Sequence, residues 1–300
     1  MKPTLADALL MPSAATVRAA MGKTIAVIPD VHLRPFETRS AFDRIHAAGK
    51  WIAHHRPDYV VIIGDLEHFG SLQTYDGGTA RDLDGEAVNR DIEAFKAGLK
   101  ALTETIRAAN RRHKKAKRHH LIHEPIWIFC SGNHEEFWLR WKATKLRGHD
   151  FIQKLVEAAG MHWIPFLETA WIENVGFSHY QKSGTKKQAA SIQTMLRGHR
   201  SFVVGHEHVW DMRRERVYGG GHITVIKAGC FKAPDDIDHD AGEWSGLTLL
   251  TDVRDGSFGV QQHSYDQVLE AFGEGDYAQE LRARRAQYVA DMSAAGKAFS

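Results

Sequence analysis

The sequence predicts an α/β fold in which two sheets pack together, and three observations support that prediction. Short apolar runs rich in β-branched residues alternate with amphipathic stretches in the first half of the chain. These runs are unbroken rather than alternating, as in strands covered on both faces. The second half contains further apolar runs with little helical pattern between them. One layered domain fits this order better than two separate domains.

The first half of the chain reads as strand and helix in turn. Strands are predicted at 24–30, 58–65 and 125–132. Helices are predicted at roughly 38–55, 86–110, 135–148 and 150–160. The helix at 86–110 has the clearest pattern, because its apolar residues recur at spacings of 4-3-4-3-4.

The second half is mostly strand. Apolar runs predict strands near 170–178, 201–205, 222–229, 246–252 and 257–264. A helix is expected near 187–197, and the tail from 265 to 298 has a helical pattern. We therefore expect a single domain over 1–300, with a core at about 24–264, a short extension at 1–22 and a helical tail at 265–300.

Composition excludes several classes of protein. The chain has 300 residues and a net charge of only +2, so a strong attraction to acidic partners would have to come from a local patch. No apolar run approaches the roughly 18 residues that a membrane span needs, and we expect no membrane partner. The N-terminus is a poor secretory signal, and Cys130 and Cys230 sit in apolar runs as buried thiols would. These features favour a cytoplasmic protein, whereas its oligomeric state is not indicated.

Metal-binding residue types follow five of the predicted strands at their carboxyl ends. They are Asp30 and His32, Asp65, Asn133 and His134, His179, and finally His206 and His208. Ligands bind at this edge of an α/β sheet, so these side chains are expected to share one site. A single histidine after a strand is usually a hydrogen-bonded loop residue, but five such strand ends in one chain predict a metal site.

The size of this ligand set indicates two metal ions. Two carboxylates, one amide oxygen and four imidazoles exceed the three protein ligands of a single catalytic ion. They suit two ions about 3.5–4 Å apart, which can clamp the oxygens of a phosphoryl group. Nitrogen and oxygen ligands without thiolate favour Mn, Fe, Zn or Ni, and we expect Mn first.

The order of the motifs "PDVH", "GDLEH", "SGNHE", "SHY" and "GHEH" resembles that of the calcineurin-like metallophosphoesterases. The resemblance spans residues 24 to about 230 and implies a four-layer αββα sandwich, with two packed mixed sheets flanked by helices. It implies that the first metal is held by Asp30, His32, Asp65 and His208. The second would be held by Asp65, as a bridge, with Asn133, His179 and His206. His134 would lie near the phosphate without binding metal and would stabilise the transition state or protonate the leaving oxygen, so that His134 and Asp65 are the candidate catalytic residues.

Two departures from the family patterns narrow the function. The phosphoprotein phosphatases of this superfamily carry an Asp that orients the catalytic His, and an Arg that holds phosphate, in the second motif. This chain has "GDLEHFG", with His68 at the Asp position and no Arg, so the partner that orients His134 is left open. The motif is closer to the "GDLFH" of the superfamily's repair nucleases. In the fourth motif Tyr180 replaces the frequent Gly, which makes His179 the least secure ligand.

The substrate is less well defined. A long loop at 67–86 begins at the metal ligands, and its side chains His68, Tyr75 and Arg81 are candidate substrate contacts. The run "RRHKKAKRHH" at 111–120 has six Lys and Arg and no acid. It could follow a nucleic-acid backbone, but a basic helix end followed by a solvated loop is the favoured interpretation.

The preferred function is a two-metal phosphodiesterase or nuclease acting on DNA, RNA or nucleotides. The alternative is a phosphomonoesterase, and a less favoured one is a non-enzymatic nucleic-acid-binding protein, whose binding would survive chelation. A degenerate scaffold would lack ligands, and none is missing from the motifs.

Overall fold

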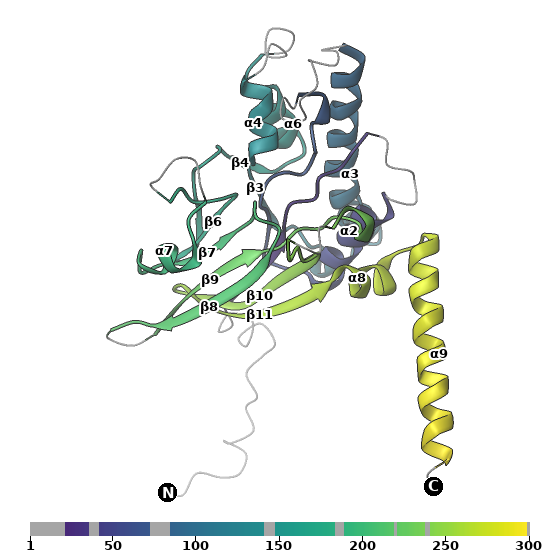
Figure 1. Ribbon diagram of the computed structural model, residues 1–300. Coiled ribbons are helices and arrows are strands. Elements are labelled where there is room, and N and C mark those ends of the chain that lie inside the picture. Colours follow the sequence, from purple (N-terminus) through teal and green to yellow (C-terminus); the bar gives the residue numbers. More distant parts are fainter. Residues whose placement is uncertain are drawn as a thin grey trace, which may run out of the picture.

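The computed structural model describes residues 22–35, 42–72, 85–140, 148–183, 189–218, 221–237 and 241–298. Two mixed sheets pack face to face, and helices lie on their outer sides (Figure 1). The arrangement confirms the predicted α/β fold with four layers.

The first sheet has six strands in the order β11-β10-β1-β2-β3-β4. Four of them are parallel: β1 (Lys23–Ile28), β2 (Tyr59–Ile62), β3 (Ile126–Cys130) and β4 (His162–Ile164). The hairpin of β10 (Gly246–Arg254) and β11 (Ser257–Ser264) joins β1 antiparallel. Because β1, β2 and β3 run the same way, their carboxyl ends meet at one edge.

The second sheet has five strands in the order β5-β6-β7-β9-β8. Its parallel centre consists of β6 (Val175–Ser178), β7 (Ser201–Val204) and β9 (His222–Ala228). The edges β5 (Ala170–Ile172) and β8 (Trp210–Arg216) are antiparallel to their neighbours.

The strands of the first sheet are apolar throughout because both faces are buried. Side chains alternate across a strand, so Ala26 and Ile28 of β1 face the helices while Ile25 and Val27 face the second sheet. All four side chains are inaccessible to solvent. This double burial accounts for the unbroken apolar pattern in the sequence.

The helices cover the outer faces. The helical core of the first sheet comes from α2 (Asp43–His55), α3 (Gly85–Lys115), α4 (Asn133–Arg140), α6 (Phe151–Ala158) and α8 (Tyr265–Phe272). The short α7 (Ile192–Leu196) packs on the second sheet. The last helix, α9 (Asp276–Ala298), leaves the body of the protein and extends away from it (Figure 1). Short 3₁₀ turns lie at Gly70–Leu72, His119–Leu121 and Pro234–Asp236.

Several predicted elements differ in detail from the observed ones. The strand expected near 170–178 is a hairpin, because Glu173 and Asn174 take left-handed φ angles of 47° and 61° and turn the chain between β5 and β6. The tail is divided into α8 and α9 by Gly273–Gly275. Two strands were missed: β4 has three residues, and β8, "WDMRRER", is an exposed edge strand with charged residues.

The state of the two cysteines and the length of the apolar helices can be compared with what the sequence predicts. Cys130 and Cys230 are buried free thiols, and burial raises the pKa of each to about 12. Within the described residues, no helix combines the length and apolar character needed to cross a bilayer.

Candidate metal centre

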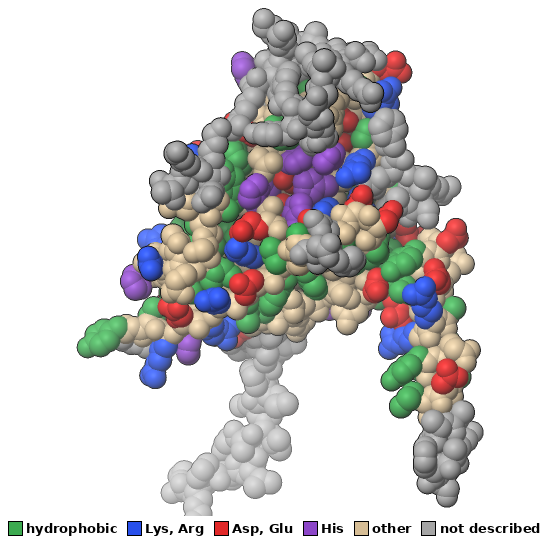
Figure 2. Space-filling model, viewed as in Figure 1, with side chains coloured by type: hydrophobic (Ala, Val, Ile, Leu, Met, Phe, Trp, Pro, Cys, Tyr) green, Lys and Arg blue, Asp and Glu red, His purple; other side chains and the backbone are tan. Residues whose placement is uncertain are grey.

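The predicted ligands meet where the carboxyl ends of the parallel strands of the two sheets adjoin. Residues after β1, β2 and β3 supply the ligands of the first sheet, and residues after β6 and β7 supply those of the second. Figure 2 shows the resulting cluster of histidines on one face of the molecule. All seven predicted ligands lie in this cluster, and three potential metal-binding groups of side chains are found around it.

The first group consists of Asp30, His32 and His208. The two imidazoles face each other through their Nε2 atoms at 3.0 Å, and His208 Nε2 lies 3.6 Å from Asp30 Oδ1. Asp30 is inaccessible to solvent, and its Oδ2 has no hydrogen-bond partner within the described structure. A buried carboxylate oxygen without a donor is costly unless a cation is bound there.

The second group consists of Asp65, His179 and His206, with Asn133 beside them. Asn133 Oδ1 lies 2.8 Å from His179 Nε2 and 2.9 Å from His206 Nδ1. The other ring nitrogen of His179 donates to the carbonyl of Ile63 at 2.8 Å. In the neutral ring, that bond leaves the Nε2 lone pair facing the amide oxygen. Acceptor atoms at this separation fit a shared cation, so the residues suit a metal ion here as well.

Asp65 lies between the two groups. Its Oδ2 is 3.3 Å from His179 Nε2 of the second group and 3.8 Å from His32 Nε2 of the first. Its Oδ1 accepts the backbone N–H of His134 at 2.9 Å. This position is the one that a carboxylate bridging two ions would occupy.

His134 belongs to neither of these groups. Its Nδ1 donates to the backbone carbonyl of His68 at 2.5 Å, and its Nε2 lies 3.8 Å from Asp65 Oδ2. The orienting partner that the sequence left open is therefore a main-chain oxygen, which fixes the ring with Nε2 toward the centre. Every residue has a main-chain carbonyl, so the sequence alone could not identify this partner.

His68, a predicted substrate contact, lies at the border of the centre. Its Nδ1 is 3.3 Å from His32 Nδ1, and it forms the third potential metal-binding group with His32 and His134. Burial, reinforced by the His134 charge, lowers the pKa of His68 to about 4, so its ring is neutral at pH 7. The other two predicted contacts, Tyr75 and Arg81, lie outside the described residues.

The backbone around the ligands is strained. Four predicted ligands have left-handed φ angles, which are 50° for His32, 47° for Asp65, 75° for His206 and 58° for His208. Non-glycine residues adopt this region at a cost, and such residues cluster at functional sites. Two glycines allow the close approach of neighbouring chain segments, since a Cβ on Gly132 would lie 2.1 Å from Asp65 Oδ1 and one on Gly205 would lie 2.3 Å from Asp30 Oδ2.

Glu135 holds together the loop after β2 and the loop after β3, a role that the sequence did not indicate. Its carboxylate accepts the backbone N–H groups of Asp65, Leu66 and Gly132 at 2.9, 3.0 and 2.8 Å. Burial, together with the charge of Asp65, raises the pKa of Glu135 to about 8. The only sequence signal is its place in "SGNHE", next to His134.

His208 is held by an ionic relay that the sequence did not reveal. His208 Nδ1 lies 2.6 Å from Glu243 Oε1, and Glu243 Oε2 lies 2.6 Å from the ammonium of Lys232. Both side chains are mostly buried, at 10% and 13% exposure. A carboxylate on one ring nitrogen directs the lone pair of the other toward a metal. Tyr180 packs on a different ligand, stacking on His206 with ring centroids 4.6 Å apart.

Burial and neighbouring charges shift the pKa values of four predicted ligands. Burial raises the pKa of Asp30 to about 7; the Asp65 charge adds to this, while the His179 charge opposes it. Burial lowers the pKa of His206 to about 4 and that of His32 well below its usual value. Burial alone would raise the pKa of Asp65, but the His179 and His134 charges outweigh it and lower that pKa. Neutral imidazoles and an ionised carboxylate are the forms that bind metal.

Comparison with known families agrees with this chemistry. The sequence profile described as "Calcineurin-like phosphoesterase" matches residues 23–229, which include all seven predicted ligands and His134. The chain belongs to the calcineurin-like phosphoesterases. This phosphoesterase is therefore a hydrolase of phosphate esters, and its family is metal-dependent.

Solved structures similar to this phosphoesterase include two from bacteria. Yfce, a phosphoesterase from E. coli, is 13% identical, with 79% of this chain and 98% of that chain covered and a TM-score of 0.35. TT1561 of Thermus thermophilus is 10% identical, with 80% and 99% covered and a TM-score of 0.33. No curated protein matches the sequence.

Proposed function

We propose that this calcineurin-like phosphoesterase is a two-metal phosphodiesterase that acts on nucleic acids or nucleotides. The observation that carries the proposal is the pair of ligand groups on either side of Asp65. In this assignment the first ion is bound by Asp30, His32 and His208, and the second by Asn133, His179 and His206, with Asp65 shared. We expect Mn²⁺ first, with Fe, Zn or Ni as alternatives.

The bound ions would polarise the phosphoryl oxygens and activate the attacking water. His134 is the group of the chain that we assign to proton transfer. Its Nδ1 is engaged by the His68 carbonyl, so Nε2 is the nitrogen available to a substrate beside Asp65. From there it can donate a hydrogen bond to the developing charge or a proton to the leaving oxygen.

The charges at the border of the centre favour a diester over a monoester. A monoester carries two negative charges and benefits from an additional cation, whereas a diester carries one. Two cations adjoin the centre, and each is paired with a carboxylate: Lys232 with Glu243 at 2.6 Å and Arg34 with Asp236 at 3.5 Å. Both are thus partly neutralised, which supports a preference for the less charged substrate.

A substrate panel tests the proposal. Bis-p-nitrophenyl phosphate and p-nitrophenyl phosphate are compared with Mn²⁺, Ni²⁺, Zn²⁺ and Mg²⁺, before and after chelation. We expect the diester to be cleaved at least as well as the monoester, and chelation to abolish both activities. A strong preference for the monoester would establish the alternative, a phosphomonoesterase.

We also propose a cytoplasmic location, because two buried free thiols suit a reducing compartment.

A further inference from the structure

The end of α3 carries an unusual concentration of positive charge. Residues 111–118 contain six Lys and Arg and no acidic residue, while the whole chain has a net charge of +2. All six side chains are exposed. They are Arg111, Arg112, Lys114, Lys115, Lys117 and Arg118, and we refer to them as the basic surface.

Most of these charges are not used within the protein. Arg111 pairs with Glu104 at 2.5 Å and Lys114 pairs with Glu124 at 3.3 Å. The other four cations make no ion pair with any residue that the structure describes. Like charges this close repel one another, so the basic surface suits a polyanion that lies across it.

Capping of α3 does not explain the basic surface. Three of the last four carbonyls of α3 accept backbone hydrogen bonds: Ala116 donates to Arg112 at 3.0 Å, Lys117 to Lys114 at 3.1 Å and Arg118 to His113 at 2.8 Å. Lys117 and Arg118 lie beyond the end of the helix at Lys115, where the attraction of the helix dipole fades. The helix can therefore end in this way without these six cations.

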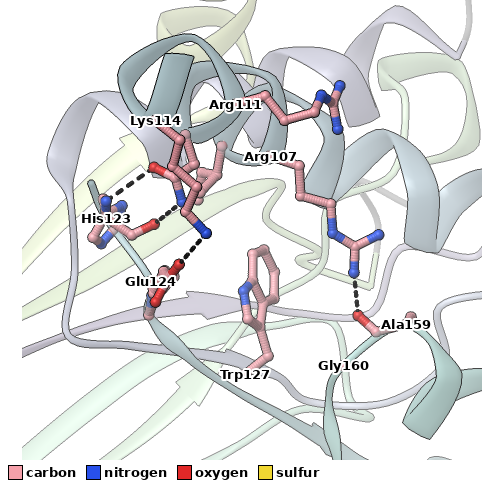
Figure 3. Close-up of a pocket in the computed structure, with 11 residues that line it drawn as sticks. Arg107, Arg111, Lys114, His123, Glu124, Trp127, Ala159 and Gly160 are labelled. Carbon is pink, nitrogen blue, oxygen red and sulfur yellow. Dashed lines mark hydrogen bonds and ion pairs between the residues drawn. The ribbon is translucent and has the colours of Figure 1, made fainter. Parts of the chain in front are cut away.

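A hollow of about 350 Å³ adjoins the basic surface. Arg107, Arg111 and Lys114 line it, with Glu124 as the one acidic residue among its lining residues. Figure 3 shows the indole of Trp127 between Lys114 and Arg107. The guanidinium of Arg107 donates to the carbonyl of Ala159 at 2.5 Å. Trp127 is only 8% exposed and packs in the core, so the hollow presents cations suited to a phosphate rather than a ring open to a base.

The basic surface lies at the opposite end of β3 from the metal centre. The end of α3 is tied to the loop before β3, because the side chain of Asn110 bonds the backbone N–H and carbonyl of His123 at 3.0 and 2.7 Å. Asn133 follows the other end of β3. At about 3.3 Å per residue, the separation is roughly 20 Å. A phosphate at the metal centre thus cannot touch the basic surface, but a distant part of a polymer can.

We propose that the basic surface and its hollow form a second binding site, which holds a nucleic-acid strand by its phosphates, away from the point of cleavage. The inference rests on the proposed function and specifies its substrate as a polymer. An anionic membrane is less favoured, because Leu121 at 36% and Ile126 at 44% are the only exposed large apolar side chains along 111–127, beside six cations. Four exposed cations without an ion pair among the described residues suit the phosphates of such a strand.

Binding is measured in the Asp65→Asn background with EDTA, so that neither metal nor cleavage contributes. A labelled 30-nucleotide single strand is titrated by fluorescence anisotropy at several salt concentrations. The test variant changes Arg112, Lys115, Lys117 and Arg118 to Ser. The control variant removes the same charge elsewhere, by changing Lys154, Arg254, Arg284 and Arg285 to Ser, all of which are exposed and in surface ion pairs.

The test variant should bind at least about tenfold more weakly at low salt, and the control variant within about twofold of the parent. The slope of log Kd against log salt should flatten by roughly 0.7 for each phosphate that the variant no longer neutralises. With Asp65 intact, cleavage of bis-p-nitrophenyl phosphate should be unchanged in the test variant. Equal weakening by both variants, or binding of anionic vesicles as tight as that of the strand, would overturn the proposal. Loss of the proposed function would appear instead as failure to cleave the small diester.

Discussion

The two ligand groups use the same residue types but hold them in different ways. In the second group, the ring of His179 is fully buried and donates to the main-chain carbonyl of Ile63, the residue that follows β2. In the first group, His208 is 19% exposed and depends on the Glu243–Lys232 relay. His179 is thus positioned by the backbone, and His208 by an acidic side chain that is itself paired with a lysine.

If two ions bind as proposed, this difference implies that they are not equivalent. Ligands held by main-chain bonds lose little freedom on binding, whereas a ligand held by a chain of side-chain contacts is positioned less firmly. We expect the ion at Asn133, His179 and His206 to be retained more firmly than the one at Asp30, His32 and His208. The following predictions test this comparison.

The largest effect is expected from Asp65→Asn. The shared carboxylate adjoins both groups, so its loss should remove both ions and abolish turnover. Metal content after dialysis and activity with excess Mn²⁺ are measured together. Full retention of one ion would contradict the placement of Asp65 between the groups.

His134→Ala should separate catalysis from metal binding. Its ring is oriented by the His68 carbonyl and is absent from both ligand groups. The rate of diester cleavage should fall by about 10²–10⁴, the usual range for a general acid or a charge-stabilising donor. Metal content should match that of the parent, and an empty site would show that His134 is a ligand.

Glu243→Gln should affect only the first group. Removing the partner of a metal-bound histidine commonly weakens metal binding by about 10–100-fold. Competition with a chelator should show one weakened ion and one unchanged. Glu207→Gln is the matched control, since Glu207 sits between the two ligand histidines and pairs with Lys227 at 2.5 Å. Equal weakening by both variants would mean that overall charge, rather than the His208 contact, is responsible.

A smaller effect is expected in the pH dependence of the chelated protein. Burial lowers the pKa of His68 and His206 from 6.5 to about 4, so below pH 6.5 the unfolded chain binds protons that the folded chain does not, and stability rises with pH. Burial raises the pKa of Asp30 to about 7 and of Glu135 to about 8, so the folded chain keeps protons that the unfolded chain loses, and these groups make stability fall with pH.

Above pH 6.5, Asp30 and Glu135 are the only ones of these four groups that still change the stability, and they make it fall as the pH rises. Below pH 6.5 the two rises and the two falls nearly cancel, so the melting temperature in EDTA should be nearly level up to about pH 6.5 and decline toward pH 8. Mn²⁺ should reduce the decline, because a metal-bound Asp30 stays ionised. A melting temperature that rises steadily to pH 8 would contradict these assignments.

The location of the centre could be predicted because it depends on local sequence. A strand, its carboxyl end and the ligand that follows are adjacent in the chain, as in the runs ending at Asp30 and Asp65. Parallel strands bring these ends to one edge, so five short motifs were enough to predict that the seven candidate ligands lie close together.

The supporting contacts could not be predicted because they join distant segments. Glu243 meets His208 across 35 residues, and the partner of His134 is a main-chain oxygen 66 residues away. The edge strand β8 was missed because its side chains are charged and exposed, so it lacks the apolar pattern that marks a buried strand. The basic run was interpreted as a helix end followed by a loop, and α3 does extend to Lys115, five residues beyond the predicted bound of 110. The lack of ion pairs for four of the six cations, among the described residues, is visible only in the structure.

The most direct test of the two-ion assignment is the metal content of the purified protein. Protein loaded with Mn²⁺ at pH 7.5 and freed of excess metal is measured by elemental analysis, and then dialysed briefly against a weak chelator and measured again. The account predicts two ions per chain at first and one after the brief dialysis, with activity lost alongside the first ion to leave. No bound metal, together with no gain of activity on adding Mn²⁺, would contradict it.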